Sequence, residues 1–376
     1  MRLSKKVFGL VAASCAVLSL AACSNTAKTE STTAAAESSM ESMESKEGES
    51  MSMEETTKAM EEAMAGKDLK DVKVGISIYK FDDNFMTLYR TELERYLIEL
   101  GIPKENITIV DGKGDQAEQT NQINNFITSK VDVMILNLVQ ASSAPTVTDL
   151  ANTAGIPVVY INREPDVAEE ERWTKDGLKA TYVGADARQS GTYQGEQIVE
   201  LENKGDINGD GKVSYVMIQG DPENVDAQYR TEFSVKAVTD AGLEGEELLK
   251  QRGDWDQAKG QQIAADALTQ FGEKIEVIFC NNDAMALGAL QAIEAAGRTV
   301  GEDIYIVGVD ALAEACQNVS DGKMTGTVFN DFIGQAKTAG DVALMFVNGE
   351  KVEAVNMVDY VKVTKDNAAE ILEQVK

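Results

Sequence analysis

From Val72 onward the chain alternates between two hydrophobic spacings, one typical of strands and one typical of helices. Short, almost unbroken apolar runs predict strands at Val74–Tyr79, Ile107–Val110, Val131–Leu136 and Pro157–Ile161. Between them, apolar residues at helical spacing predict helices at Phe85–Leu100, Gln116–Ser129 and Ala144–Ala154. Apolar strands that alternate with amphipathic helices are typical of a parallel sheet covered on both faces.

The same alternation continues through the second half of the chain. It predicts strands at Thr181–Val183, Val213–Ile218, Ile275–Phe279, Ile304–Val307 and Gly326–Val328, and helices at Ser190–Glu202, Asp226–Ala241, Gln257–Phe271, Ala284–Ala296, Ala311–Val319 and Gly334–Val347. Two successive series in about 300 residues indicate an α/β protein with two similar doubly wound lobes joined by a hinge. We expect residues 71–160 and about 330–356 in the N-terminal lobe, and residues 161–329 and about 357–376 in the C-terminal lobe.

The first 70 residues have a different character. Arg2, Lys5 and Lys6 precede an apolar stretch that ends in small residues and Cys23. This pattern predicts a lipoprotein signal peptide over residues 1–22, with Cys23 lipidated after cleavage. An ordinary signal peptide that happens to contain a cysteine is the alternative. Residues 23–70 are rich in Ser, Thr, Ala, Glu and Met, which favours a disordered tether to the cell membrane.

Composition excludes several function classes. The chain has 376 residues, a net charge of −28 and no histidine. The acidic balance argues against nucleic acid as a partner. The absence of histidine excludes Ser-His-Asp catalysis and any histidine metal site. Cys280 and Cys316 lie in apolar stretches, so we expect buried free thiols rather than a disulfide.

One contiguous motif indicates calcium. Oxygen-bearing residues stand at positions 1, 3, 5 and 9 of a loop with glycine at position 6, the spacing of an EF-hand loop; they are Asp206, Asn208, Asp210 and Ser214, and Lys212 at position 7 would offer its carbonyl. Position 12 is Met217 instead of glutamate, and a strand follows instead of a helix. The last carboxylate must therefore come from elsewhere in the chain. The alternative is an Asp-Gly turn on an acidic surface.

A second group of polar residues follows the predicted strands. Open α/β sheets bind ligands beyond the carboxyl ends of their strands, which here places a ligand between the two lobes. The residues found there are carboxylates, amides, an arginine and aromatics, which suit a sugar, because sugars offer hydroxyls that both donate and accept and C–H faces that stack. For Asp83, Asn282, Asp310 and Asn330 taken singly, helix capping is the alternative.

These motifs resemble those of the galactose/glucose-binding branch of the type I periplasmic binding proteins, over roughly residues 71–370. The resemblance rests on Tyr79–Met86, Asn137–Val139, Asn281–Ala286, Gly308–Leu312 and Gly326–Asp331. It implies hydrogen bonds to a monosaccharide from Asp83, Asn137, Asn224, Asp226, Arg230, Asn282, Asp310 and Asn330, with Phe85 and Trp255 stacked on the ring. The branch has a histidine where this chain has Asn224.

The resemblance also completes the calcium loop. It implies that Glu276 supplies the missing carboxylate to a structural Ca²⁺ site distant from the sugar. Ser214 stands where the branch has glutamine.

The implied function is capture of glucose or galactose by a monomeric lipoprotein that delivers it to an ABC permease. A sugar-sensing subunit for a membrane receptor or kinase is the alternative. A calcium-containing glycoside hydrolase that uses Asp226 and Asp310, or Asp83, is a more remote one.

Overall fold

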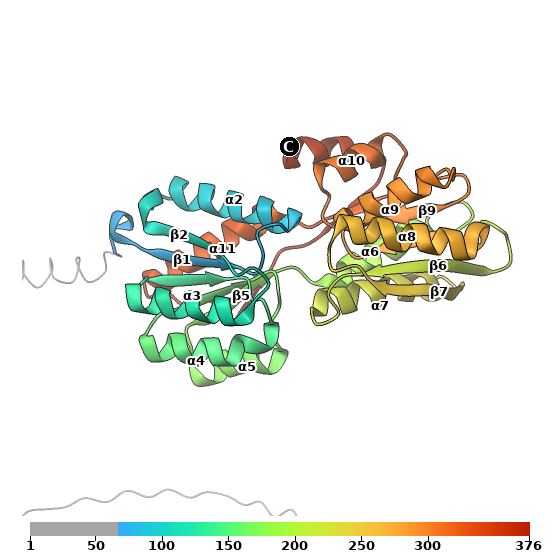
Figure 1. Ribbon diagram of the computed structural model, residues 1–376. Helices are drawn as coiled ribbons and strands as arrows, with labels where there is room; N and C mark the ends of the chain where they lie inside the picture. Colours follow the sequence, from blue (N-terminus) through green and yellow to red (C-terminus); the bar gives the residue numbers. More distant parts are fainter. Residues whose placement is uncertain (1–66) are drawn as a thin grey trace, which may run out of the picture. The chain divides into compact units, whose positions relative to one another are not determined.

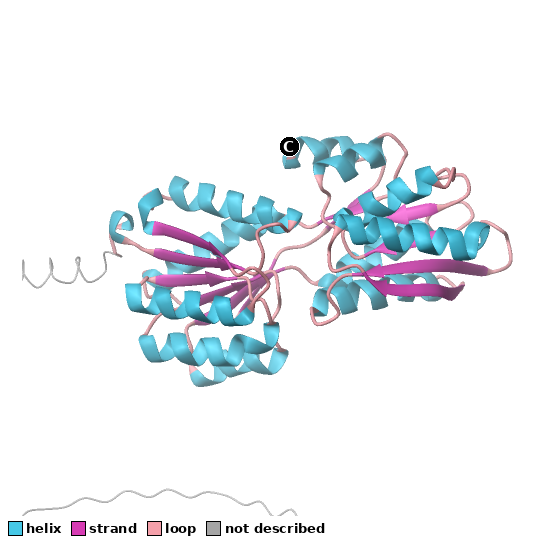
Figure 2. Ribbon diagram, in the orientation of Figure 1, coloured by secondary structure: helices cyan, strands magenta, loops and turns pink. Residues whose placement is uncertain are grey.

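The structure is a computed structural model that describes residues 67–376. The predicted signal peptide, the predicted lipidation site Cys23 and most of the predicted tether lie outside these residues. The described part contains two parallel sheets with helices on both faces (Figures 1 and 2). None of its helices is long and apolar enough to span a bilayer.

The first sheet has six strands, in the order β11-β5-β4-β3-β1-β2. These are β1 (Val74–Ile78), β2 (Ile107–Asp111), β3 (Val133–Leu136), β4 (Val158–Ile161), β5 (Ala180–Gly184) and β11 (Val355–Met357). Every pair is parallel. Strands β1, β3, β4 and β5 are buried along their whole length, which explains their unbroken apolar sequences.

Helices cover both faces of this sheet. They are α2 (Asn84–Glu99), α3 (Gln116–Ser129), α4 (Ala144–Ala154), α5 (Val167–Asp176) and α11 (Phe332–Val347). Successive residues of β3 point to opposite faces: Ile135 joins the core with α2 and α11, whereas Met134 joins the core with α3, α4 and α5. Figure 1 shows α2 and α3 on opposite sides of the strands.

The second sheet repeats this plan with four strands in the order β7-β6-β8-β9. They are β6 (Lys212–Gln219), β7 (Glu244–Arg252), β8 (Val277–Cys280) and β9 (Tyr305–Val307), all parallel. Beside β9, β10 (Thr327–Phe329) pairs antiparallel with β12 (Val361–Val363). The helices are α6 (Ala187–Val199), α7 (Val225–Asp240), α8 (Gln257–Phe271), α9 (Asp283–Ala295), α10 (Ala313–Ser320) and α12 (Ala368–Val375).

Four short 3-10 helices complete the described secondary structure. They are η1 (Leu69–Asp71), η2 (Lys104–Asn106), η3 (Ala141–Ser143) and η4 (Gly272–Lys274). Cys280 and Cys316 are free and buried, as predicted. The chain passes between the two lobes three times: between β5 and α6, between β10 and α11, and between β11 and β12.

The predicted lobe boundary at residue 161 is wrong. The strand predicted at Thr181–Val183 was assigned to the second lobe, but as β5 it pairs with β4 and β11 in the first sheet. Consecutive strand–helix units look alike in sequence, and only strand pairing reveals their sheet. The intervening helix α5 was not predicted because its sequence is dominated by charge. Strand β7 was also missed: it is an edge strand, charged and largely exposed.

Candidate functional site

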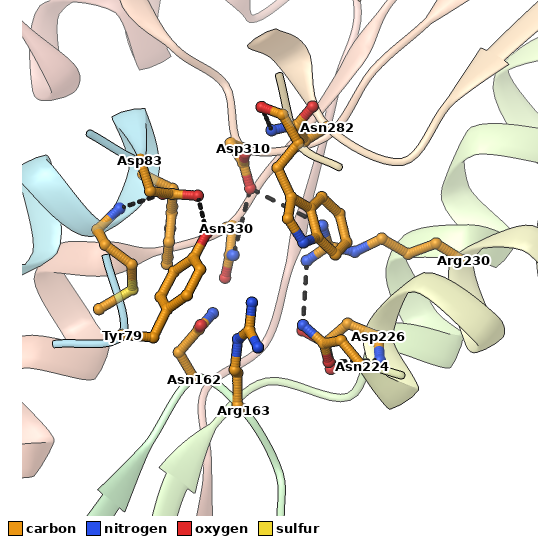
Figure 3. Close-up of a pocket in the computed structure, with 13 residues that line it drawn as sticks. Tyr79, Asp83, Asn162, Arg163, Asn224, Asp226, Arg230, Asn282, Asp310 and Asn330 are labelled. Atoms are coloured by element: carbon orange, nitrogen blue, oxygen red, sulfur yellow. Dashed lines mark hydrogen bonds and ion pairs between the residues drawn. The ribbon is translucent and has the colours of Figure 1, made fainter. Parts of the chain in front are cut away.

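A small cavity lies where the strand ends of both lobes meet. It is lined by Tyr79, Asp83, Phe85, Met86, Asn162, Arg163, Asn224, Asp226, Arg230, Trp255, Asn282, Asp310 and Asn330. Figure 3 shows Tyr79 and Asp83 on one side of this cleft and Asp226 and Arg230 on the other. The structure thus brings together nine of the ten residues predicted to bind the ligand.

Three of the polar side chains are held in place because they cap the N-termini of helices. Asp83 caps α2 by accepting from the Met86 N–H at 2.7 Å, and its other oxygen accepts from the Tyr79 hydroxyl at 2.6 Å. Asn282 caps α9 through the Met285 N–H, and Asn224 caps α7 through the Asp226 N–H. These residues therefore both cap a helix and line the cavity, because the cap residue of a helix that follows a strand lies at the carboxyl end of that strand.

Asp310 and Asn330 are not caps. The residues that precede α10 and α11 are Leu312 and Asp331. The Asn330 amide lies 3.4 Å from the Asp310 carboxylate, and its carbonyl oxygen accepts from Gln335 at 2.6 Å. The capping alternative is therefore excluded at these two positions.

Arg230 is the central cation of the cavity and is only 3% exposed. Its guanidinium donates to the Asn281 carbonyl at 2.8 Å and to the Tyr360 hydroxyl at 2.9 Å. It lies 3.7 Å from the Asp226 carboxylate and 4.0 Å from that of Asp310. Its Nε has no hydrogen-bond partner in the described part of the chain. The site thus keeps a buried donor for a further acceptor.

Burial dominates the electrostatics of the cavity carboxylates. It raises the pKa of Asp226 to about 6, although Arg230 and Arg163 oppose this by favouring the charged form. Burial also raises the pKa of Asp310 above its usual range, again against the attraction of Arg230. Hydroxyl groups of a ligand would restore some of the hydrogen bonds that these carboxylates lose on leaving water.

Two aromatic side chains, one from each lobe, supply flat apolar surface. Phe85 lies in the first turn of α2, and Trp255 precedes α8. Trp255 and its neighbour Asp254 both have positive φ, at 64° and 53°. The indole packs so closely on Gly220 that a Cβ there would lie 2.2 Å from the ring. The chain therefore uses a strained turn and a glycine to place this ring.

Four cavity residues were missed in the sequence, namely Tyr79, Met86, Asn162 and Arg163. Asn162 and Arg163 directly follow β4, so the strand-end argument applied to the other strands would have found them. Arg163 stacks on the Tyr79 ring at 3.9 Å and donates to the Val139 carbonyl at 2.7 Å. Its Nη1 also lies 3.9 Å from the carboxylate of Asp221 in the other lobe.

Asn137, in contrast, does not line the cavity. It is fully buried at the end of β3, where its side-chain oxygen accepts from the Tyr79 N–H at 3.2 Å. Its amide donates to the Ile161 carbonyl and to the Asn162 side chain, both at 3.1 Å. Asn137 therefore ties the ends of β1, β3 and β4 together behind the cavity wall.

The loop predicted to bind calcium folds around Asp206. The Asp206 carboxylate accepts from the N–H groups of Gly209, Asp210 and Gly211, and Gly211 has the positive φ (87°) that the sharp bend requires. Asn208 and Asp210 accept from N–H groups two residues on, Ser214 lies 3.5 Å from Glu246, and Lys212 pairs with Glu244.

Glu276 reaches this loop from the start of β8. It is buried, and its carboxylate accepts from the N–H groups of Ile207, Asn208 and Ser214 at 2.7–3.0 Å. The donor set is all oxygen and fits a hard cation in chemistry. Within residues 67–376, however, no three His, Cys, Asp or Glu side chains are gathered closely enough to hold a metal ion. Calcium at this loop stays a prediction.

The fold and cleft define a class: a two-lobed ligand-binding protein with its ligand site between lobes. Residues 74–351 match the model of the periplasmic binding protein domain family, and the chain belongs to this family. Membership implies an extracytoplasmic location, and the chain is a binding protein rather than an enzyme. The predicted type I fold is confirmed.

Individual relatives within the family are sugar-binding and solute-binding proteins. The chain is 34% identical to the D-galactose/methyl-galactoside binding periplasmic protein MglB of Haemophilus influenzae, over 80% of this chain and 92% of the relative. It is 28% identical to the ribose import binding protein RbsB of Bacillus subtilis, over 76% and 84%. An ABC transporter solute binding protein from Bacillus halodurans, solved with bound myo-inositol, superposes with a TM-score of 0.71 at 29% identity, covering 82% of this chain and 99% of that one.

Proposed function

We propose that this protein captures a monosaccharide, glucose or galactose, in the cleft between its lobes and delivers it to an ABC-type permease. The observation that carries the proposal is the composition of the cavity. Three aromatic rings, three carboxylates, four amides and two guanidinium groups converge on one small volume. The galactose-binding relative from Haemophilus influenzae supports the choice of sugar, while the ribose- and inositol-binding proteins are the competing precedents.

The cavity chemistry suits a pyranose. Each sugar hydroxyl both donates and accepts, and carboxylates, amides and arginine offer acceptors and donors in fixed planes. Phe85 and Trp255 offer rings for the C–H faces, and both lobes contribute. Asn224 replaces a histidine of the galactose/glucose branch, and its shorter amide is where we expect sugar preference to differ.

A glycoside hydrolase activity has little support. Asp226 and Asp310 both lie against the same Arg230 guanidinium, at 3.7 and 4.0 Å, which suits holding a ligand. A hydrolase needs one carboxyl group as proton donor and another as nucleophile or base on opposite sides of a glycosidic bond. A sensing role for a membrane receptor remains compatible with the same binding event.

The calcium site is part of the proposal. Asp206, Asn208, Asp210, Ser214 and Glu276, with the Lys212 carbonyl, would hold one structural Ca²⁺. What supports it is the loop spacing and the buried Glu276 carboxylate, which lies on the loop although it is 62 residues or more away in sequence. The ion would tie the start of β6 to the start of β8.

Attachment to the membrane is the remaining part. Cleavage before Cys23 and lipidation of its thiol would leave the binding lobes on a tether outside the cell membrane, acting as a monomer beside the permease. The basic and apolar pattern of residues 1–22 supports this. Radiolabelled palmitate should be incorporated by the wild type and not by Cys23→Ala.

Incubation with aryl glycosides and disaccharides tests binding without turnover. We expect no product, together with saturable monosaccharide binding. Sustained hydrolysis that disappears in Asp310→Ala would contradict the binding-only function.

A further inference from the structure

We propose that Asp283, which lies outside the cavity, is a positioning residue that holds the Asp310 carboxylate in the cleft. The proposal rests on the function above, in which Asp310 contacts the sugar. Asp283 is fully buried in the first turn of α9, directly after the cavity residue Asn282. It touches the turn that presents Asp310 and not the cavity itself.

The turn that carries Asp310 is strained. Asp310 has a φ of 118° and Ala311 a φ of 56°, so two consecutive non-glycine residues have positive φ. Side chains at such positions collide with their own backbone, and the conformation persists only where surrounding contacts impose it. The Asp310 N–H donates to the Val328 carbonyl, which fixes one end of the turn.

Asp283 fixes the other end. One carboxylate oxygen accepts from the Leu312 N–H at 2.9 Å, and the other accepts from the Thr327 hydroxyl at 2.7 Å. The Thr327 oxygen in turn accepts from the Ala311 N–H at 3.3 Å, and the Asp283 N–H donates to the Val309 carbonyl at 2.7 Å. The Asp283–Thr327 pair thus binds the backbone on both sides of Asp310.

The Asp283 carboxylate lies very close to the backbone that follows β9. A Cβ on Gly308 would lie 2.1 Å from the Asp283 carboxylate, so only glycine leaves room. A carboxylate without solvent is unfavourable, and burial raises the pKa of Asp283 to about 7. The N-terminus of α9 and the hydrogen bonds at its oxygens offset part of that cost. The turn that Asp283 holds in place therefore explains why the fold keeps a buried carboxylic acid at this position.

The carboxylate can be removed with little change in shape. In Asp283→Asn, one oxygen becomes an N–H donor that cannot accept from Leu312 or Thr327. Sugar affinity should fall roughly tenfold, the size that loss of one buried hydrogen bond produces. Asp115→Asn, at the exposed start of α3, is the matched control and should bind as the wild type does, because asparagine caps helices equally well.

A double-mutant cycle separates positioning from general stability. If Asp283 acts through Asp310, Asp283→Asn should cause no further loss of affinity in an Asp310→Ala background, measured at millimolar sugar. An equal loss in both backgrounds would overturn the proposal, because Asp283 would then act on binding by another route.

If Asp283→Asn does not fold, two substitutions of Thr327 test the same contact. Thr327→Val removes the hydroxyl that links Asp283 to Ala311, and Thr327→Ser retains it. Affinity should fall in the valine variant and be preserved in the serine variant. Equal affinities in the two would count against the proposal.

Amide exchange without sugar tests the turn itself. Hydrogen exchange of the Leu312 N–H should accelerate at least tenfold in Asp283→Asn and stay unchanged in Asp115→Asn. Unchanged Leu312 exchange in Asp283→Asn overturns the role of Asp283. Failure of the wild type to bind any monosaccharide would overturn the proposed function instead, and the exchange result would still decide the role of Asp283.

Discussion

The cleft and the loop over residues 206–214 are both rich in side-chain oxygens, yet they hold those oxygens differently. In the loop, the Asp206 carboxylate is surrounded by the N–H groups of its own turn, and the Glu276 carboxylate accepts three more. In the cleft, Asp226 and Asp310 come from different strand ends, and Arg230 keeps an unpaired Nε within the described chain. The loop carboxylates are thus satisfied by N–H groups of the chain itself, whereas the cleft keeps polar groups for a ligand.

This difference predicts where mutations act. Loss of a cleft side chain removes contacts to the ligand, so it should change affinity far more than stability. Loss of a loop carboxylate removes contacts within the fold, so it should change stability far more than affinity. Each of the following experiments measures both quantities.

The largest expected effect is that of Asp310→Ala on affinity. A hydrogen bond to a charged group contributes about 1.5–3 kcal/mol, so sugar affinity should fall by up to about a hundredfold. The melting temperature should change little. Calorimetric titration and thermal unfolding measure the two, with the exposed Asp366→Ala as control. A large drop in melting temperature with unaltered affinity would reverse the assignment of Asp310.

Removal of calcium should give the next largest effect, on stability. A ligand at a hundred times its dissociation constant stabilises the folded state by about 2.7 kcal/mol. Chelation should therefore lower the melting temperature by roughly 5 °C, at about 2 °C per kcal/mol for a chain of this size. Sugar affinity should stay within about twofold, because the proposed calcium site lies outside the cleft.

Two variants sharpen this test. Glu276→Gln should abolish the response of the melting temperature to chelator, and the exposed Glu273→Gln should retain it. A melting temperature that ignores chelator in the wild type would make the loop a turn held only by its own backbone. Loss of sugar binding on chelation would place the ion in the cleft.

Trp255→Ala should weaken sugar binding about tenfold, which corresponds to about 1.4 kcal/mol and is typical of a stacked aromatic. The two tryptophans make a matched pair. Trp173 is buried in the first lobe, where it stacks on Tyr160 at 5.3 Å. Intrinsic fluorescence should respond to sugar in Trp173→Phe and lose the response in Trp255→Phe. The opposite pattern would contradict the cavity assignment.

The smallest expected effect concerns pH. Burial raises the pKa of Asp226 to about 6 and that of Asp283 to about 7, whereas in the unfolded chain both titrate near the ordinary aspartate value of about 4. The folded state therefore binds more protons between about pH 4 and pH 7. The stability that these two groups contribute is greatest at the acidic end of that window and is lost as pH rises through about 7.

Denaturant unfolding at pH 5 and pH 8 measures this dependence. The protein should be more stable at pH 5 by at least about 1 kcal/mol, since one pKa unit corresponds to about 1.4 kcal/mol. Asp283→Asn should reduce the difference, because it removes one of the titrating groups. Equal stability at both pH values in the wild type would show that these carboxylates are not buried as described.

Much of the fold could be predicted because buried parallel strands are apolar along their length. The predictions that depend on pairing could not. Thr181–Val183 has the sequence of any buried strand, and nothing local assigns it to the first sheet. The charged edge strand β7 has only Leu248 and Leu249 as large apolar residues, since its side chains are largely exposed.

The candidate site was predictable where a polar residue directly follows an apolar strand. This principle, together with the family resemblance, selected nine cavity residues. It failed at Asn137, because a residue at a strand end can turn inward and bind neighbouring strands. The role of Asp283 was also hidden, because the positive φ values of Asp310 and Ala311 are visible only in the structure.

Calorimetric titration of the purified protein with single monosaccharides tests the central claim most directly. The panel should include glucose, galactose, ribose and myo-inositol, the last two as the ligands of the compared proteins. We predict one saturable site per chain for glucose or galactose, with the heat of binding much reduced in Asp310→Ala. Absence of heat for every monosaccharide, or binding that is unaffected by Asp310→Ala and Trp255→Ala, would contradict the account of this cleft as a sugar site.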